Sequence, residues 1–177
     1  MTAGLRGILA FCALALAALQ AAPVRTAPQL LPAGPVLLTV TGAVTRPNAG
    51  PQAVFDLAML DALPQHHTVT ATPWHEGTPT FSGPLLADIL AAAGAGGPVL
   101  RVIGLDDYAA DIPVSDIESY PVILATRIDG ATIPVRAKGP LIVIYPFDRH
   151  PELVNEVIVA RSVWQVRAID VPPDTGR

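Results

Sequence analysis

Two short stretches of the chain combine side chains that could bind a ligand or transfer protons. In the first, Trp74, His75 and Glu76 place an aromatic ring, an imidazole and a carboxylate in one loop. Functional loops carried by a rigid scaffold often have this composition. A structural loop, whose tryptophan covers the core while its histidine and glutamate face solvent, explains the same residues. The sequence leaves both interpretations open.

The second stretch is the turn Asp148-Arg149-His150, which follows a buried apolar run and is bounded by Pro146 and Pro151. Its side chains could bind an anion or transfer protons. An ion pair between Asp148 and Arg149 that only fixes the turn is the simpler interpretation, because exposed ion pairs are common and individually weak. We predict that this turn and the Trp74 loop border one pocket.

A zinc site built from the histidines is not favoured. His66, His67, His75 and Glu76 supply enough ligands in number. However, neighbouring residues of a strand point to opposite faces, so His66 and His67 cannot readily share an ion. We assign no metal ligand from the sequence.

The remaining polar groups have structural explanations. Asp106 and Asp107 resemble a catalytic carboxylate pair, yet a hairpin turn accounts for both. Arg127 and Arg136 flank a predicted hairpin and are expected to be solvated. Ser82 lacks the glycine context of a hydrolase nucleophile. No catalytic residue is therefore assigned.

The N-terminus has the pattern of a secretory signal. Arg6 is followed by an apolar stretch, residues 7–19, in which Cys12 is the only polar residue. A membrane-spanning helix needs roughly 20 apolar residues, so this segment is too short to remain as an anchor. We predict a signal peptide over residues 1–22 and a periplasmic or secreted mature protein. Because Cys12 is the only cysteine, the mature protein would contain no thiol.

Composition limits the partners and the architecture. The chain has a net charge of -4, and loss of Arg6 with the signal makes the mature protein more acidic. Nucleic acids and anionic membrane surfaces are therefore excluded as partners. Without disulfides, packing alone must stabilise the fold. The 19 prolines argue against long helices and for short strands joined by turns.

Strand and turn patterns dominate the mature sequence. We predict a proline-rich arm over residues 23–35, a single domain over 36–171 and a short tail over 172–177. The predicted strands are 36–44, 67–72, 99–105, 108–113, 141–145 and 162–171, with a hairpin over 122–135 around Asp129-Gly130. Helices are predicted over 55–63 and 83–93, the second with Pro84 in its first turn and ending at Gly94, with a helical turn at 115–120. The fold class is α+β.

Three segments resemble one known family. The run Phe81-Ser82-Gly83-Pro84-Leu85-Leu86, with Ala93-Gly94-Ala95 after it, resembles the segment that follows the metal-binding loop in the sulfite oxidase family. A later stretch is similar to the family's glycine, hydrophobic-proline and buried-strand region, namely Asp129-Gly130, Ile133-Pro134, Lys138-Gly139-Pro140-Leu141 and Tyr145-Pro146. Val163-Trp164-Gln165-Val166 resembles its closing strand. The match covers most of residues 36–171 and implies a molybdopterin-binding fold.

The chain departs from that family where the chemistry would lie. In the family, a cysteine thiolate of one loop ligates molybdenum, but the corresponding residues 72–77 contain no cysteine. Imidazole or carboxylate differs from thiolate in donor strength and geometry. The family's lysine-rich phosphate-contacting stretch is replaced here, which leaves Arg161 to meet a phosphate. The residues assigned to a molybdopterin-like pocket are Trp74, His75, Glu76, Asp148, Arg149, His150 and Arg161.

Two classes of function remain. The first is an exported, non-catalytic module that binds a small-molecule ligand or an envelope protein partner through this pocket. The second is a molybdopterin-dependent oxidoreductase with an atypical metal environment. The missing thiolate favours the first class, whereas the preserved framework keeps the second open.

Overall fold

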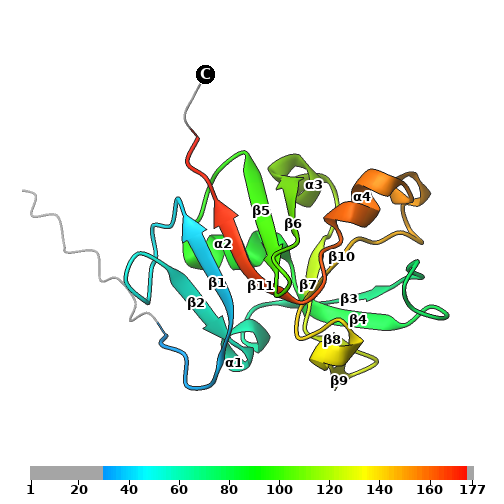
Figure 1. The fold of residues 1–177 in the computed structure, drawn as a ribbon, viewed down its shortest axis with the longest axis horizontal. Helices are drawn as coiled ribbons and strands as arrows, with labels where there is room; N and C mark the ends of the chain where they lie inside the picture. The colour runs from blue at the N-terminus through cyan, green and yellow to red at the C-terminus, as the bar shows by residue number, and fades with distance from the viewer. Residues whose placement is uncertain (1–29, 175–177) are drawn as a thin grey trace, which may run out of the picture.

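Residues 30–174 are described by the computed structural model, which is drawn in Figure 1. The largest sheet has five strands in the order β2-β1-β11-β5-β6. These strands are β1 (Val36–Gly42), β2 (Ala53–Asp56), β5 (Val99–Gly104), β6 (Ala109–Pro113) and β11 (Val166–Val171). β11 pairs in parallel with β1 and antiparallel with β5, so the last strand lies in the middle of the sheet beside the first.

One face of this sheet is covered by the helix α2 (Leu86–Ala93), which lies behind the sheet in Figure 1. Leu38 and Val40 on β1 pack into this core and have no exposed surface. Thr39 lies on the opposite face, because side chains alternate along a strand. Gly94 ends α2 in the left-handed conformation with a φ of 59°. The predicted stop of this helix is confirmed.

A second sheet has the order β3-β4-β8-β9. Its strands are β3 (Gln65–Val69), β4 (Thr80–Pro84), β8 (Arg127–Ile128) and β9 (Ala131–Thr132). The turn between β8 and β9 is Asp129-Gly130, whose φ values of 48° and 80° are both positive. The predicted turn is confirmed, since a tight turn of this kind requires positive φ at both central residues. The hairpin covers only residues 127–132 and not 122–135, because residues 123–125 pair with residues 142–144 instead.

The strands β7 (Ile123–Ala125) and β10 (Ile142–Ile144) form an antiparallel pair that separates two cores. Leu124 and Val143 face the larger core beneath the five-stranded sheet. The smaller core receives the alternate side chains of the pair together with others: Phe81, Ile123, Ala125, Ile133, Ile142 and Ile144. The prediction that residues 141–145 form a strand buried on both faces is confirmed for β10.

Short helices complete the described part of the chain. They are α1 (Leu57–Asp61), α3 (Val114–Ser119), α4 (Glu156–Arg161) and the 3-10 turns η1 (Val135–Ala137) and η2 (Pro151–Leu153). The buried Asp56 carboxylate accepts the Met59 amide at the start of α1 and also the amides of Ala33 and Gly34. These bonds, that of Gly34 first, lower the pKa of Asp56. The carboxylate ties the arm before β1 to α1.

Two predicted helices were placed too early in the chain. The apolar run at 55–63 begins as the buried strand β2, and only Leu57–Asp61 is helical. The run at 83–93 begins as β4, so Pro84 ends a strand instead of opening the helix. In both cases pairing with a neighbouring strand overrides the local helical pattern. The last strand begins at Val166 and not at residue 162, and α4 was not predicted.

Two glycines allow close contact between backbones. An added Cβ at Gly83 would lie 2.0 Å from Leu124 O, and one at Gly139 would lie 1.9 Å from Ile133 O. Both distances are far below ordinary van der Waals contact. Gly83 therefore fixes the crossing of β4 over β7, and Gly139 fixes the loop that precedes β10.

The structure confirms the α+β class, with several sheets and few short helices. None of the helices within residues 30–174 has the length and hydrophobicity that a membrane span requires. The predicted signal peptide, most of the proline-rich arm and the end of the tail lie outside the described residues.

Candidate functional site

The Trp74 loop is a tight turn between β3 and β4. A backbone bridge pairs Thr72 with His75, and the His75 amide also donates to the Thr72 hydroxyl oxygen at 3.2 Å. The Thr72 hydroxyl and Nδ1 of His75 share a further hydrogen bond of 3.1 Å. One buried threonine thus fixes both the backbone and the imidazole of the loop. Glu76 is exposed at its rim.

Aromatic rings surround the half-buried Trp74 side chain. Its ring centroid lies 5.3 Å from that of Trp164 and 6.5 Å from that of Phe147, the latter in an edge-to-face arrangement. Within residues 30–174, the indole Nε1 is the one buried side-chain polar atom without a hydrogen-bond partner. An unpaired buried N–H costs about 1 to 3 kcal/mol. A hydrogen-bond acceptor that reached it would relieve that cost.

His75 is held in its neutral form. Its ring packs against Phe81 with centroids 5.4 Å apart. Burial first, and then the positive charge of Lys138, lower the pKa of His75 below its usual value. The ammonium of Lys138 lies 3.5 Å from the centroid of the Trp164 ring, which is a cation–π contact.

The Asp148 segment lies beside the start of this loop, but the pocket predicted to be shared by the Trp74 loop and the Asp148 turn is only partly formed, because Asp148 alone of the predicted residues lines it. Asp148 accepts the Ala71 amide at 3.2 Å, and the Asp148 amide donates to Thr70 Oγ1 at 3.1 Å. A cavity of about 200 Å³ lies between the two segments. It is lined by Ala71, Thr72, Pro73, Phe147, Asp148, Val154 and Val159, so the other predicted site residues are not part of its wall.

Arg149 and His150 turn away from that cavity. No ion pair joins Asp148 and Arg149 among the contacts of residues 30–174, so the pair proposed to fix the turn is replaced by the Asp148 bonds to the backbone. Arg149 borders a separate small cavity of about 70 Å³ with His66 and His67. His150 lies 3.1 Å from Glu152 and packs its ring against Tyr120.

Arg161 is held inside the protein and is not free to meet a phosphate. Its guanidinium lies 2.9 Å from the Asp116 carboxylate, which also accepts the Tyr145 hydroxyl at 2.9 Å. Tyr145 is fully buried, and burial together with the Asp116 carboxylate raises the pKa of its hydroxyl. This network ties α4 to α3 and to the end of β10.

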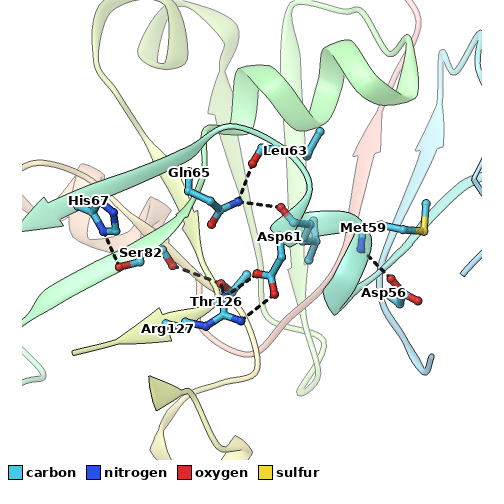
Figure 2. Close-up of polar contacts among 10 residues, drawn as sticks. Asp56, Met59, Asp61, Leu63, Gln65, His67, Ser82, Thr126 and Arg127 are labelled. Atoms are coloured by element: carbon cyan, nitrogen blue, oxygen red, sulfur yellow. Dashed lines mark hydrogen bonds and ion pairs between the residues drawn. The ribbon is translucent and has the colours of Figure 1, made fainter. Parts of the chain in front are cut away.

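Figure 2 shows a second polar group, in which His67 and Ser82 lie beside Arg127 and Asp61. His67 Nδ1 and Ser82 Oγ lie 2.8 Å apart because the two residues are paired across β3 and β4. Arg127 makes two bonds to the Asp61 carboxylate, at 2.5 and 2.7 Å, so the expectation that Arg127 is solvated is wrong. Cross-strand pairing explains the Ser82 contact, and no acid orients His67 among the described residues.

The donor set does not fit a sulfite oxidase-type molybdenum centre. Residues 72–77 contain no sulfur ligand, and the hydroxyl of Thr72 is already bonded to His75. Over residues 30–174, no three His, Cys, Asp or Glu side chains gather closely enough to hold a metal ion. Arg161, the residue left to meet the phosphate, is occupied by Asp116. The residues present can line a binding surface, but they do not supply the metal ligands.

Sequence reasoning missed a second cavity beside Trp164. It has a volume of about 280 Å³ and is lined by Asp106, Tyr108, Val159, Ala160, Ser162, Val163, Trp164 and Gln165. Asp106 was treated only as a turn residue, and α4, which forms one wall, was not predicted. The exposed aromatic Tyr108 in the β5–β6 turn was an available indication.

The chain matches no protein-family model, and no curated protein matches it.

Proposed function

We propose that this chain is an exported, non-catalytic module with a sulfite oxidase-like molybdopterin-binding fold, acting in the periplasm or outside the cell. Its Trp74 loop would bind a small-molecule ligand or an envelope protein partner. The order of the family-like segments between residues 81 and 166 supports the fold, and the signal-like N-terminus supports export.

The observation that carries the proposal is the hydrogen bonding of the polar side-chain atoms in the Trp74 loop. Thr72 and His75 satisfy each other, whereas Nε1 of Trp74 is left as an unpaired donor among aromatic rings. This donor suits a flat ligand that carries a hydrogen-bond acceptor, and because Nε1 is buried, such a ligand would have to displace part of the loop to reach it. It offers neither a free nucleophile nor a soft metal ligand for turnover.

The test is to produce the protein in cells with ample molybdenum cofactor and to measure bound molybdenum, pterin and dye-linked turnover of sulfite and sulfoxides. We expect no stoichiometric molybdenum and no turnover. Stoichiometric molybdenum together with turnover would establish the alternative, a molybdopterin-dependent oxidoreductase. Tight pterin retention without turnover would support a binding or carrier role for the same loop.

Cysteine variants make the experiment more specific. Thr72→Cys, Pro73→Cys and Trp74→Cys each place a thiol in the segment where the family carries its ligand. If the fold proposal is right and only the ligand is lost, one of these variants gains molybdenum that the parent lacks. A matched Ala58→Cys variant on the exposed surface of α1 controls for nonspecific metal binding by a new thiol.

A further inference from the structure

The cavity between Tyr108 and Trp164 is separate from the cavity beside the Trp74 loop, although Trp164 contacts Trp74 and Val159 lines both cavities. Its walls come from the β5–β6 turn, from Val159 and Ala160 on α4, and from residues 162–165 before β11. Tyr108 is 48% exposed and Trp164 is 39% exposed, so the cavity opens to solvent between two aromatic side chains. Its volume of about 280 Å³ suits a small ligand.

Two hydroxyls of the wall have committed their hydrogens within the protein. The Tyr108 hydroxyl donates to Ala160 O at 2.9 Å, and the buried Ser162 hydroxyl donates to Ile158 O at 3.0 Å. One N–H of the Gln165 amide donates to Val135 O at 2.8 Å. Hydroxyl oxygens keep acceptor capacity when their hydrogens are committed. The two hydroxyls therefore offer acceptors to a ligand.

Asp106 adds a negative charge to this wall that no cation offsets. One of its oxygens accepts the Tyr108 amide at 3.1 Å, and within residues 30–174 the carboxylate forms no ion pair. Its neighbour Asp107, by contrast, pairs with Arg167 at 2.5 Å. The nearby cations have other positions, since Lys138 lies over the Trp164 ring and Arg161 pairs with Asp116.

The backbone brings a second acceptor close to this carboxylate. Asp106 Oδ1 and Trp164 O both lie near Gly104, since an added Cβ there would be 2.9 Å from each. A protonated amine carries several donors and one positive charge, which suits the charged carboxylate of Asp106. Val159 and Val163 would face the apolar part of such a ligand.

We propose that the cavity between Tyr108 and Trp164 binds small organic amines in their ammonium form, with the charged head at Asp106 and the apolar body against Val159 and Val163. This ligand class differs from the acceptor-bearing ligand expected at Trp74. The cavity site also does not require the molybdopterin-like fold assignment to be correct.

Three probes of similar size and shape but different charge test whether the cavity prefers a cation. Benzylamine, benzyl alcohol and benzoate are titrated into the purified protein in phosphate buffer free of amines, and binding is followed by backbone amide shifts. We expect benzylamine to bind with shifts at Ala160 and Val163, and the alcohol to bind about tenfold more weakly, because a hydrogen bond to a charged group is the stronger kind. Benzoate should not bind. Equal binding of all three, or a preference for benzoate, would overturn the proposal.

Matched variants locate the head group. Asp106→Asn keeps an oxygen for the Tyr108 amide but removes the charge, and it should weaken benzylamine binding about tenfold. Asp107→Asn removes the same charge one residue away and should leave binding within about twofold. Ala160→Leu, at an exposed position of α4, should block the cavity without breaking the helix. Equal losses for Asp106→Asn and Asp107→Asn would refute a specific role for Asp106.

Discussion

The Trp74 loop and the Tyr108 cavity both contact Trp164, yet they use their polar groups in opposite ways. In the loop, the Thr72 hydroxyl and the His75 imidazole bond to each other. In the cavity, the Tyr108 hydroxyl donates to Ala160 O, whereas the Asp106 carboxylate accepts the Tyr108 amide and forms no ion pair within residues 30–174. The loop has the composition of a functional site, whereas the turn at Asp106 looks like simple hairpin geometry. A ligand can bond only to the donors and acceptors that remain free after folding. Residue types alone do not show which of them remain free.

Truncating the two tryptophans separates a packing role from a surface role. Trp74→Ala should lower the free energy of unfolding by about 3 kcal/mol, because it removes a ring packed against Phe147 and Trp164 and adjoining both cores. Trp164→Ala should cost clearly less, since this ring is 39% exposed. Urea unfolding measures both. If Trp74→Ala left the free energy of unfolding unchanged, Trp74 would have no structural role. The loop would then not differ from the Tyr108 cavity in this respect.

A variant of Asp116 tests whether the hydrogen bonds among Asp116, Tyr145 and Arg161 stabilise α4. This helix forms part of the wall of both cavities. Asp116→Ala should cost about 2 kcal/mol, because it leaves the buried Tyr145 hydroxyl and the Arg161 guanidinium without their acceptor. Asp148→Ala is the matched control, and removal of this exposed carboxylate should cost less than about 1 kcal/mol. Similar losses for the two variants would show that Arg161 does not depend on Asp116.

The smallest expected effect on stability comes from protonation of His75 in the Trp74 loop. Because folding lowers the pKa of His75, the unfolded chain binds a proton more readily than the folded protein as pH falls below the ordinary histidine pKa of about 6.5. The stability contributed by the neutral imidazole is therefore present above that pH and is lost as pH falls through the folded pKa. Unfolding free energies between about pH 8 and pH 5 should decline less in His75→Asn than in the parent.

Lys138→Gln provides the control for this pH dependence. It removes the second cause of the shift and keeps the first, so the decline should shrink only in part. An unchanged decline in His75→Asn would mean that another group is responsible. The Asp56 carboxylate cannot be that group in this range, since its lowered pKa confines its effect to more acidic pH.

The parts of the fold that the sequence predicted are those set by local rules. The Asp129-Gly130 hairpin, the end of α2 at Gly94 and the buried strand β10 each follow from turn chemistry or from an apolar run. The starts of α1 and α2 did not follow, because Ala53–Asp56 and Thr80–Pro84 become strands only when partners are available across the sheet.

The site was predictable to a lesser degree. That the Trp74 loop adjoins the Asp148 segment could be expected from the two strands they follow, and the backbone bonds at Ala71 and Thr70 account for it. The engagement of Arg161 by Asp116 could not be expected, since the two residues are distant in sequence and meet only through α3 and α4. The open oxygen of Asp106 became visible only beside Trp164 and Tyr108.

The close backbone contacts at Gly83 and Gly139 also bear on how such a chain can diverge. A side chain of any size at either position would collide with a carbonyl oxygen at about 2 Å, so neither glycine can change without moving a strand. An exposed loop residue such as Glu76 carries no comparable restriction. We therefore expect substitutions at the loop surface to alter binding more readily than they alter the strand crossing at Gly83 or the loop at Gly139.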